Sequence, residues 1–228
     1  MKVFEYTNKG GRETNQDYLA HCDVSDGISL YVVADGMGGY ESGEIAAKIV
    51  GDSVCEFVAS HFSDYPEGEL LRQSFAYANS CLMLKRIAMN VPEMGSVIVA
   101  ALVARGRVSV AWLGDSRAYL IRNGKTQFVT TDHSMINELK AAGTFKESDR
   151  ELYEACVTQC IMGDNSSYTA GLVSLDTISD DILVLCSDGI HKEMDIESLP
   201  MDDDILRKQL DNLAPAMGDN LSIIRITL

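Results

Sequence analysis

Aspartates stand at the ends of apolar, strand-like segments in this 228-residue chain. Asp35, Asp115 and Asp188 each follow an apolar run and stand beside glycine or serine. Asp219 comes just before a fourth run. One such aspartate is ordinary turn chemistry. Four carboxylates brought to one edge of a sheet would repel one another strongly unless cations lay between them.

The ligand types in this pattern indicate hard divalent metal ions. The candidate ligands are all oxygens, and the four histidines share no ligand spacing, which makes them structural or surface residues: His21, His61, His133 and His191. Carboxylate oxygens suit Mg²⁺ or Mn²⁺ better than zinc. Two such ions about 3.5–4 Å apart can hold and activate a water that attacks phosphorus in line with the leaving group.

Two other kinds of phosphate-binding loop are excluded by single residues. The Gly-Lys-Thr at 124–126 resembles the end of a P-loop, but Tyr119 stands where that motif requires glycine. The Gly-Met-Gly-Gly at 36–39 follows a strand as a dinucleotide loop would, but Glu41 replaces the third glycine. Neither motif supports a nucleotide site.

Arg12 lies in the polar stretch 11–17, which precedes the first strand that the pattern predicts. A guanidinium at this place could hold two phosphate oxygens at once. From its position alone, a solvated surface arginine is the favoured interpretation.

The hydrophobic pattern predicts an α+β fold with two packed sheets and helices outside them. Short turns between successive strands favour antiparallel neighbours, and no linker or repeat divides residues 1–228, which are expected to form a single domain. The expected strands are 28–34, 96–104, 108–113, 118–121, 127–130, 170–175, 182–186 and 221–226. The first expected helix begins at Ser42. The other expected helices cover 70–82, 134–142, 149–157 and 204–213.

Composition excludes several classes of partner. The chain has 19 Lys and Arg against 34 Asp and Glu, a formal charge of −15, so nucleic acids and anionic membrane surfaces are not expected partners. The longest apolar run, 97–104, is too short to span a bilayer, and the first residues have no apolar signal core. We expect a cytoplasmic monomer with free cysteine thiols.

Six segments together resemble the signature blocks of the metal-dependent PP2C-type serine/threonine phosphatases, in that family's order. They are 11–17 (Gly-Arg, then Asn-Gln-Asp), 35–39 (Asp-Gly-Met-Gly-Gly), 114–119 (Gly-Asp-Ser-Arg-Ala-Tyr), 131–134 (Thr-Asp-His-Ser), 186–189 (Cys-Ser-Asp-Gly) and 219–220 (Asp-Asn). The match runs from Gly11 to Leu228. It implies a four-layer αββα sandwich of two antiparallel sheets flanked by helix pairs, with a dinuclear Mn²⁺ or Mg²⁺ centre at one end.

The resemblance also implies ligand roles. Asp35 would bridge the two metals, and Gly36 would bind one of them through its carbonyl oxygen. Asp188 and Asp219 would complete the first metal's shell, with Asp17 bound directly or through water. Asp35 and Asp188 are thereby the expected catalytic residues.

Two further roles follow from the resemblance, together with two departures from the family pattern. Asp115 resembles the aspartate that recruits a third, weaker metal in bacterial members, and Arg12 would hold the substrate phosphate. Met37 stands where eukaryotic members carry a histidine proposed as the general acid, as it does in bacterial-type members. Gln16 replaces a metal-associated glutamate found in some members and removes one charge.

The expected activity is hydrolysis of phosphoserine and phosphothreonine on proteins that a serine/threonine kinase has phosphorylated. Two alternatives stay open at this point. One is a catalytically silent binding module of the same fold, and the other is a phosphatase that acts on a small phosphorylated metabolite.

Overall fold

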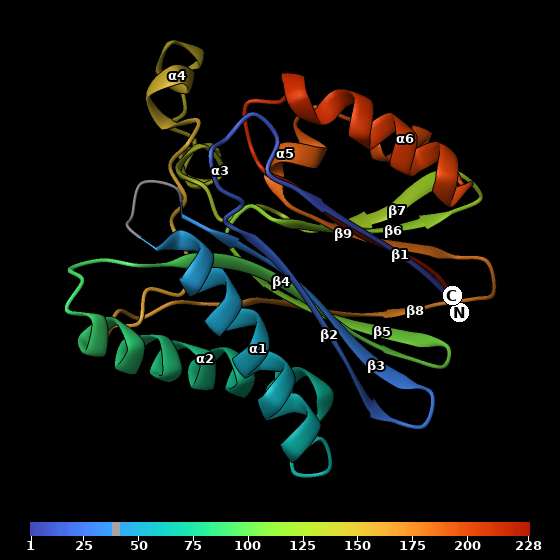
Figure 1. Cartoon of the computed structure of the whole chain (residues 1–228), viewed down its shortest axis with the longest axis horizontal. Helices are drawn as coiled ribbons and strands as arrows, with labels where there is room; N and C mark the ends of the chain where they lie inside the picture. The colour runs from blue at the N-terminus through green and yellow to red at the C-terminus, as the bar shows by residue number, and fades with distance from the viewer. Residues whose placement is uncertain (38–41) are drawn as a thin grey trace.

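Ten strands form two antiparallel five-stranded sheets in this computed structural model, which describes residues 1–37 and 42–228 (Figure 1). Sheet A has the order β1-β10-β9-β6-β7, and sheet B has the order β2-β3-β4-β5-β8. The strands are β1 (Lys2–Asn8), β2 (Asp17–Ser25), β3 (Ile28–Gly36), β4 (Ser96–Ala104), β5 (Arg107–Leu113), β6 (Arg117–Arg122), β7 (Lys125–Val129), β8 (Gly171–Asp176), β9 (Ile182–Cys186) and β10 (Leu221–Thr227). The antiparallel arrangement inferred from the short turns is confirmed.

The two sheets face each other across an aliphatic core. Val99 of β4 and Val110 of β5 belong to the same buried cluster as Leu185 of β9 and Ile224 of β10. Every residue of β4 except its last is buried, because sheet A covers one face of sheet B and helices cover the other. A strand buried on both faces reads as a continuous apolar run, which explains the run at 97–104.

Helices α1 (Gly43–His61) and α2 (Glu67–Met89) cover the outer face of sheet B (Figure 1). The residues that helical spacing places on one face of α2 are the buried ones: Leu70, Leu71, Ser74, Phe75, Ala78 and Leu82. On the other side, α5 (Asp188–His191) and α6 (Asp203–Leu213) cover sheet A, where Leu206 and Leu210 of α6 are buried. The four-layer αββα order is confirmed, although α5 is only one turn long.

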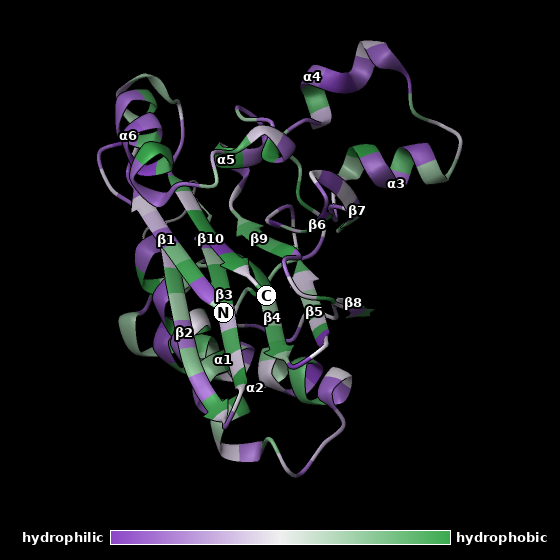
Figure 2. Ribbon diagram, turned by 90° about the vertical axis from the view of Figure 1, so that its right-hand side faces the viewer, coloured by the Kyte–Doolittle hydropathy of each residue, from purple (hydrophilic) through white to green (hydrophobic). Residues whose placement is uncertain are grey.

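The remaining helices lie near the end of the sheets. α3 (Met135–Ala141) begins after Ser134, whose hydroxyl accepts the N–H of Asn137. α4 (Arg150–Tyr153) is one turn long, so the expected helix over 149–157 is wrong in its length. Figure 2 shows α3 and α4 projecting beyond the sheets, with largely hydrophobic strands such as β9 and β10 in the body of the molecule. Three 3-10 turns complete the chain: Glu147–Asp149, Ile196–Ser198 and Ala214–Ala216.

Two N-terminal strands were not expected from the sequence. β1 lies at the edge of sheet A beside β10, and β2 lies at the edge of sheet B beside β3. Both strands keep many residues partly exposed, so their apolar alternation is weak. The polar stretch 11–17 therefore connects β1 to β2, and the expectation that it precedes the first strand is wrong.

Among the described residues, no helix combines the length and the apolar composition that crossing a bilayer requires. The six cysteines are free thiols, and Cys186 is buried whereas Cys156 is exposed.

Phe75→Ala should lower the free energy of unfolding by about 3–5 kcal/mol, because it removes a fully buried ring between α2 and sheet B. Leu84→Ala on the same helix is the control, since Leu84 is 66% exposed and should cost less than about 0.5 kcal/mol. Urea titration of both variants measures the difference. Equal losses would contradict this assignment of the buried face.

Candidate active site

Asp17 and Asp35 lie opposite each other on neighbouring strands. Asp17 is the first residue of β2, and it is the register partner of Asp35 near the end of β3. Ser187, directly after β9 of sheet A, donates its hydroxyl to Asp17 Oδ2 over 2.7 Å. The hydroxyl oxygen of Ser187 in turn accepts the N–H of Ser222 over 3.0 Å. Ser187 therefore joins the two sheets beside the paired aspartates, at the point where β9 ends and α5 begins.

Asp188 and Asp219 come together through a close backbone approach. Asp188 is the first residue of α5, and Asp219 lies in the loop before β10. A Cβ at Gly189 would lie 2.0 Å from the carbonyl oxygen of Asn220. Only glycine permits this approach of α5 to the loop that carries Asp219.

Asn220 organises the loop between β1 and β2. Its side-chain oxygen accepts the N–H of Gln16 over 2.8 Å, and its amide donates to the carbonyl oxygens of Lys9 at 2.8 Å and Thr14 at 2.9 Å. The loop between these contacts carries Arg12. The sequence placed Asn220 in a motif but gave no sign of this positioning role, because its three partners lie about two hundred residues away along the chain.

Asp115 is held in the turn between β5 and β6. Gly114 has a φ of 103°, and a Cβ there would lie 2.2 Å from the side chain of Val97. The turn therefore requires glycine on both conformational and steric grounds. His191, at the end of α5, has its Nε2 at 2.9 Å from the carbonyl oxygen of Asp115 and donates a hydrogen bond to it.

Gly36 ends β3 in a confined position. Its N–H donates to the carbonyl oxygen of Gln16 over 2.9 Å, and a Cβ would lie 2.1 Å from the carbonyl oxygen of Gly43. Met37 follows and donates its N–H to Gly95 over 3.1 Å. Gly38 and Gly39 of the same motif lie outside the described residues.

Three aspartates of the cluster, Asp17, Asp35 and Asp115, have raised pKa values. Burial and then the charges of Asp17, Asp188, Asp115 and Asp219 raise the pKa of Asp35 well above its usual range. Burial raises the pKa of Asp17 to about 7 against the lowering effect of the Ser187 hydrogen bond, with Asp188 and Asp219 adding to the rise. Burial, with Asp188, raises the pKa of Asp115 to about 6. The five carboxylates expected from the sequence thus act on one another in the fold.

The donor set fits a divalent cation. Asp17 Oδ1 is buried without a hydrogen-bond partner, so it is free to bind an ion. Carboxylate oxygens in mutual repulsion are the ligands that Mg²⁺ and Mn²⁺ prefer. Within residues 1–37 and 42–228, no three His, Cys, Asp or Glu side chains are already arranged as a shell that could hold an ion.

Two basic side chains contact the acidic cluster. Arg12 lies with one guanidinium nitrogen 3.1 Å from Asp219 Oδ2. Lys192 Nζ lies 2.6 Å from Asp188 Oδ2 and 3.8 Å from Asp115 Oδ2. Lys192 was not expected from the sequence. The signal for it was the spacing of four residues after Asp188, which becomes informative only once α5 is known to be helical.

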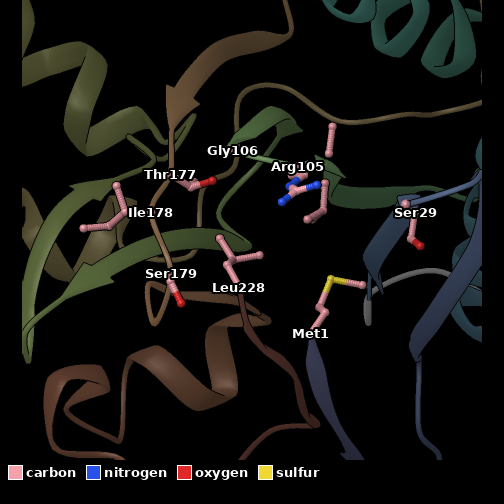
Figure 3. A pocket seen from close by; sticks show the side chains of 11 residues that line it. Met1, Ser29, Arg105, Gly106, Thr177, Ile178, Ser179 and Leu228 are labelled. Atoms are coloured by element: carbon pink, nitrogen blue, oxygen red, sulfur yellow. The ribbon is translucent and has the colours of Figure 1, made fainter.

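A small depression adjoins the acidic cluster, whereas the larger cavity lies elsewhere. A depression of about 190 Å³ is lined by Asp188, Lys192 and Asp219. A larger cavity of about 470 Å³ lies at the opposite ends of the strands, beside Ser29 and Gly106 (Figure 3). Of the residues lining the larger cavity, only Arg105 has a charged side chain, so this cavity has no part in the acidic site.

In the presence of EDTA, the free energy of unfolding should fall between about pH 4 and pH 7. The pKa of Asp17 is raised to about 7 in the folded state, so the native state holds a proton that the unfolded chain has already released. Ionisation of Asp17 therefore costs stability, about 1.4 kcal/mol for each unit of pKa shift.

Asp17→Asn is the matched control and should make this part of the profile less steep, because Asp35 and Asp115, whose pKa values are also raised, still ionise. Mn²⁺ added at pH 8 should restore more stability to the parent than to Asp17→Asn. Urea titrations at several pH values measure both effects. A parent profile that rises over this window, or that coincides with the profile of Asp17→Asn, would contradict the assignment.

Comparisons with known proteins show which family the chain resembles. The sequence model of the family "Protein phosphatase 2C" matches residues 8–221. The chain is 32% identical over 199 residues to protein phosphatase PhpP of Streptococcus pneumoniae, covering 83% of this chain and 79% of that one. It is 29% identical to the serine/threonine phosphatase stp of Listeria welshimeri, covering 78% of this chain and 73% of the relative.

The solved structures agree with the sequence comparisons. The structure of the S. agalactiae serine/threonine phosphatase superposes with a TM-score of 0.83 at 26% identity, over 100% of this chain and 99% of that one. The family model, the relatives and the fold agree, and the chain belongs to the protein phosphatase 2C family of metal-dependent serine/threonine phosphatases.

Proposed function

We propose that residues 1–228 act as one protein phosphatase domain that releases phosphate from phosphoserine and phosphothreonine in proteins phosphorylated by a serine/threonine kinase. One observation carries this proposal: the charges of four other aspartates, which lie on or next to strands of both sheets, raise the pKa of Asp35. Divalent cations relieve that repulsion and are the catalysts of phosphate ester hydrolysis. The monomeric state and the cytoplasmic location expected from the sequence stay predictions.

The residues that would hold two Mn²⁺ or Mg²⁺ ions are Asp35, Gly36, Asp188 and Asp219, with Asp17 beside them. When bound, such ions supply a water activated for attack on phosphorus and neutralise the charge on the phosphate oxygens. The chain contributes placement: β3 fixes Asp35 and Gly36, and the Ser187 hydroxyl fixes one oxygen of Asp17 while leaving the other unpartnered. The choice between manganese and magnesium is not set by these oxygen ligands.

Arg12 is suited to bind the substrate phosphate. Its side chain is 51% exposed and contacts Asp219 through a single nitrogen. A guanidinium has a planar set of five donors, so the remaining N–H groups can bind two phosphate oxygens together. Arg12 thereby orients the phosphate next to the carboxylates.

No side chain at position 37 can protonate the leaving serine or threonine oxygen, because methionine carries no exchangeable proton. The silent binding module is disfavoured, because the three expected metal ligands Asp35, Asp188 and Asp219 are all retained as aspartates. A small phosphorylated metabolite stays an alternative substrate, and comparing the cleavage of phosphopeptides with that of small phosphate esters distinguishes the two.

The parent protein should release phosphate from a phosphothreonine peptide in millimolar Mn²⁺, and EDTA should abolish the release. Asp35→Asn and Asp188→Ala should each lower kcat by about 100-fold or more, because each removes a carboxylate from the ligand set. Release is measured as inorganic phosphate. A parent that binds Mn²⁺ yet cleaves small phosphate esters and no phosphopeptide would point to the metabolite phosphatase, and cleavage of neither would point to the silent module.

Arg12→Ala should raise KM for the phosphopeptide by about tenfold, because a charged hydrogen bond to phosphate is worth roughly 1.5–3 kcal/mol. Arg72→Ala on the outer helix α2 is the matched control and should leave both kcat and KM unchanged. Steady-state kinetics of both variants measure their kcat and KM values. An Arg12→Ala enzyme with the parent KM would refute the phosphate-binding role.

Peptides with basic residues beside the phosphosite should be cleaved faster than acidic ones at low salt. The net charge of −15 attracts the former and repels the latter. Because salt screens these charges, the ratio of kcat/KM values should shrink as ionic strength rises. Equal rates at low ionic strength would rule out this preference.

A further inference from the structure

Lys192 lies between two carboxylates of the acidic cluster. Its Nζ is 2.6 Å from Asp188 Oδ2 and 3.8 Å from Asp115 Oδ2. The side chains of Asp188 and Asp115 are 16% and 15% exposed, whereas that of Lys192 is 45% exposed. The ammonium group therefore covers the two acids from the solvent side.

The backbone fixes Lys192 in this place. Its N–H donates to the carbonyl oxygen of Asp188 over 3.0 Å, closing the turn of α5. Residues four apart on a helical turn lie on the same face, so the lysine side chain returns over Asp188. Asp115 is brought to the same place from another element, since its own carbonyl oxygen accepts a hydrogen bond from His191 of α5.

Lys192 can supply the positive charge that balances the cluster when Arg12 is reserved for the substrate. Five aspartates contribute five negative charges: Asp17, Asp35, Asp115, Asp188 and Asp219. Asp132, which is also nearby, is already neutralised because both of its oxygens accept hydrogen bonds from Arg117 at 2.7 Å. Two divalent ions contribute four positive charges, and the ammonium group of Lys192 contributes the fifth. Arg12 is then left for the charge of the substrate phosphate.

We propose that Lys192 is a built-in cation that bridges Asp115 and Asp188 and takes the place of a third divalent ion, so that this chain works with two ions. The proposal rests on the proposed function, because it concerns the same acidic cluster. It makes Lys192 a positioning residue: it acts on the carboxylates and has no contact with the reacting phosphate.

The geometry explains why the lysine and a third ion exclude each other. A Mg²⁺ ion shared by Asp115 and Asp188 would bind carboxylate oxygens at about 2.0–2.1 Å. The Oδ2 atom of Asp188 already accepts a hydrogen bond from the ammonium group of Lys192, and Asp115 Oδ2 faces the same nitrogen. An ion between them would lie next to a positive charge in a partly buried site, where repulsion is screened less than in water. Asp188 Oδ1 stays available to the first pair of ions.

The test counts bound Mn²⁺ per chain by equilibrium dialysis and elemental analysis at millimolar free Mn²⁺. The parent should bind two ions. Lys192→Met and Lys192→Gln should each bind a third, at least about tenfold more tightly than the parent does, because a neighbouring positive charge has been removed. Adding Asp115→Asn to Lys192→Met should return the count to two, which places the new site at Asp115.

Two variants serve as controls. Lys192→Arg keeps the positive charge and should bind two ions. Lys208→Met removes an exposed lysine of α6 and should also bind two. Circular dichroism confirms that each variant is folded. The rise in Tm caused by Mn²⁺ gives a second measurement, which should be larger for Lys192→Met than for the parent or for Lys192→Arg.

The outcomes separate this proposal from the proposed function. Three ions in the parent, or two in both neutral Lys192 variants, would overturn the role of Lys192 and leave the two-ion phosphatase standing. Fewer than two ions in the parent would refute the two-ion site itself, and the role of Lys192 with it. A third ion that persists in Lys192→Met with Asp115→Asn would also overturn the proposal, because it would lie elsewhere.

Discussion

Repulsion between carboxylates at the junction of the two sheets is the constraint on which the site depends. Asp17 and Asp35 face each other across one strand pair, and Asp115, Asp188 and Asp219 add their charges from a turn, the start of α5 and a loop. A protein interior does not tolerate such a cluster without compensating charge. The fold holds the acids in place by backbone pairing and close glycine contacts, and so keeps a region that is unfavourable alone and favourable once cations bind.

The compensation is divided between the chain and its metal ions. Arg12 approaches Asp219 from an exposed loop, and Lys192 approaches Asp188 from a rigid helical turn. Their different settings suit different tasks. An exposed arginine with a single contact can transfer to an arriving phosphate, whereas a lysine anchored by its own backbone stays with the carboxylates.

Much of the architecture could be predicted from the sequence, because the central strands and α2 have strong periodicity. The buried face of α2 and the antiparallel sheets followed from spacing and short turns. The edge strands β1 and β2 could not be predicted in this way, since their side chains alternate between partly buried and exposed positions and are not strongly apolar. A single helical turn such as α5 is too short to show a period.

The same limit applies to the site. Asp35, Asp115, Asp188 and Asp219 were visible because each one stands at the end of a recognisable strand or beside one, whereas Asp17, which begins β2, was indicated only by the family resemblance. The roles of Asn220, Ser187 and Lys192 were not, because each depends on which distant segments the fold brings into contact. A residue type at a given spacing indicates chemistry, but a hydrogen bond across two sheets is a property of the assembled fold.

The bond between Ser187 and Asp17 has a consequence for how the site is made. It joins residues separated by 170 positions, from opposite sheets. Contacts of such long sequence separation are slow to form, because the entropy of closing the loop between them must be lost first. On the ribosome, the metal-binding end can therefore assemble only after nearly all of the chain has emerged. Metal ions then act on an already docked sandwich, and cannot guide the early stages of its folding.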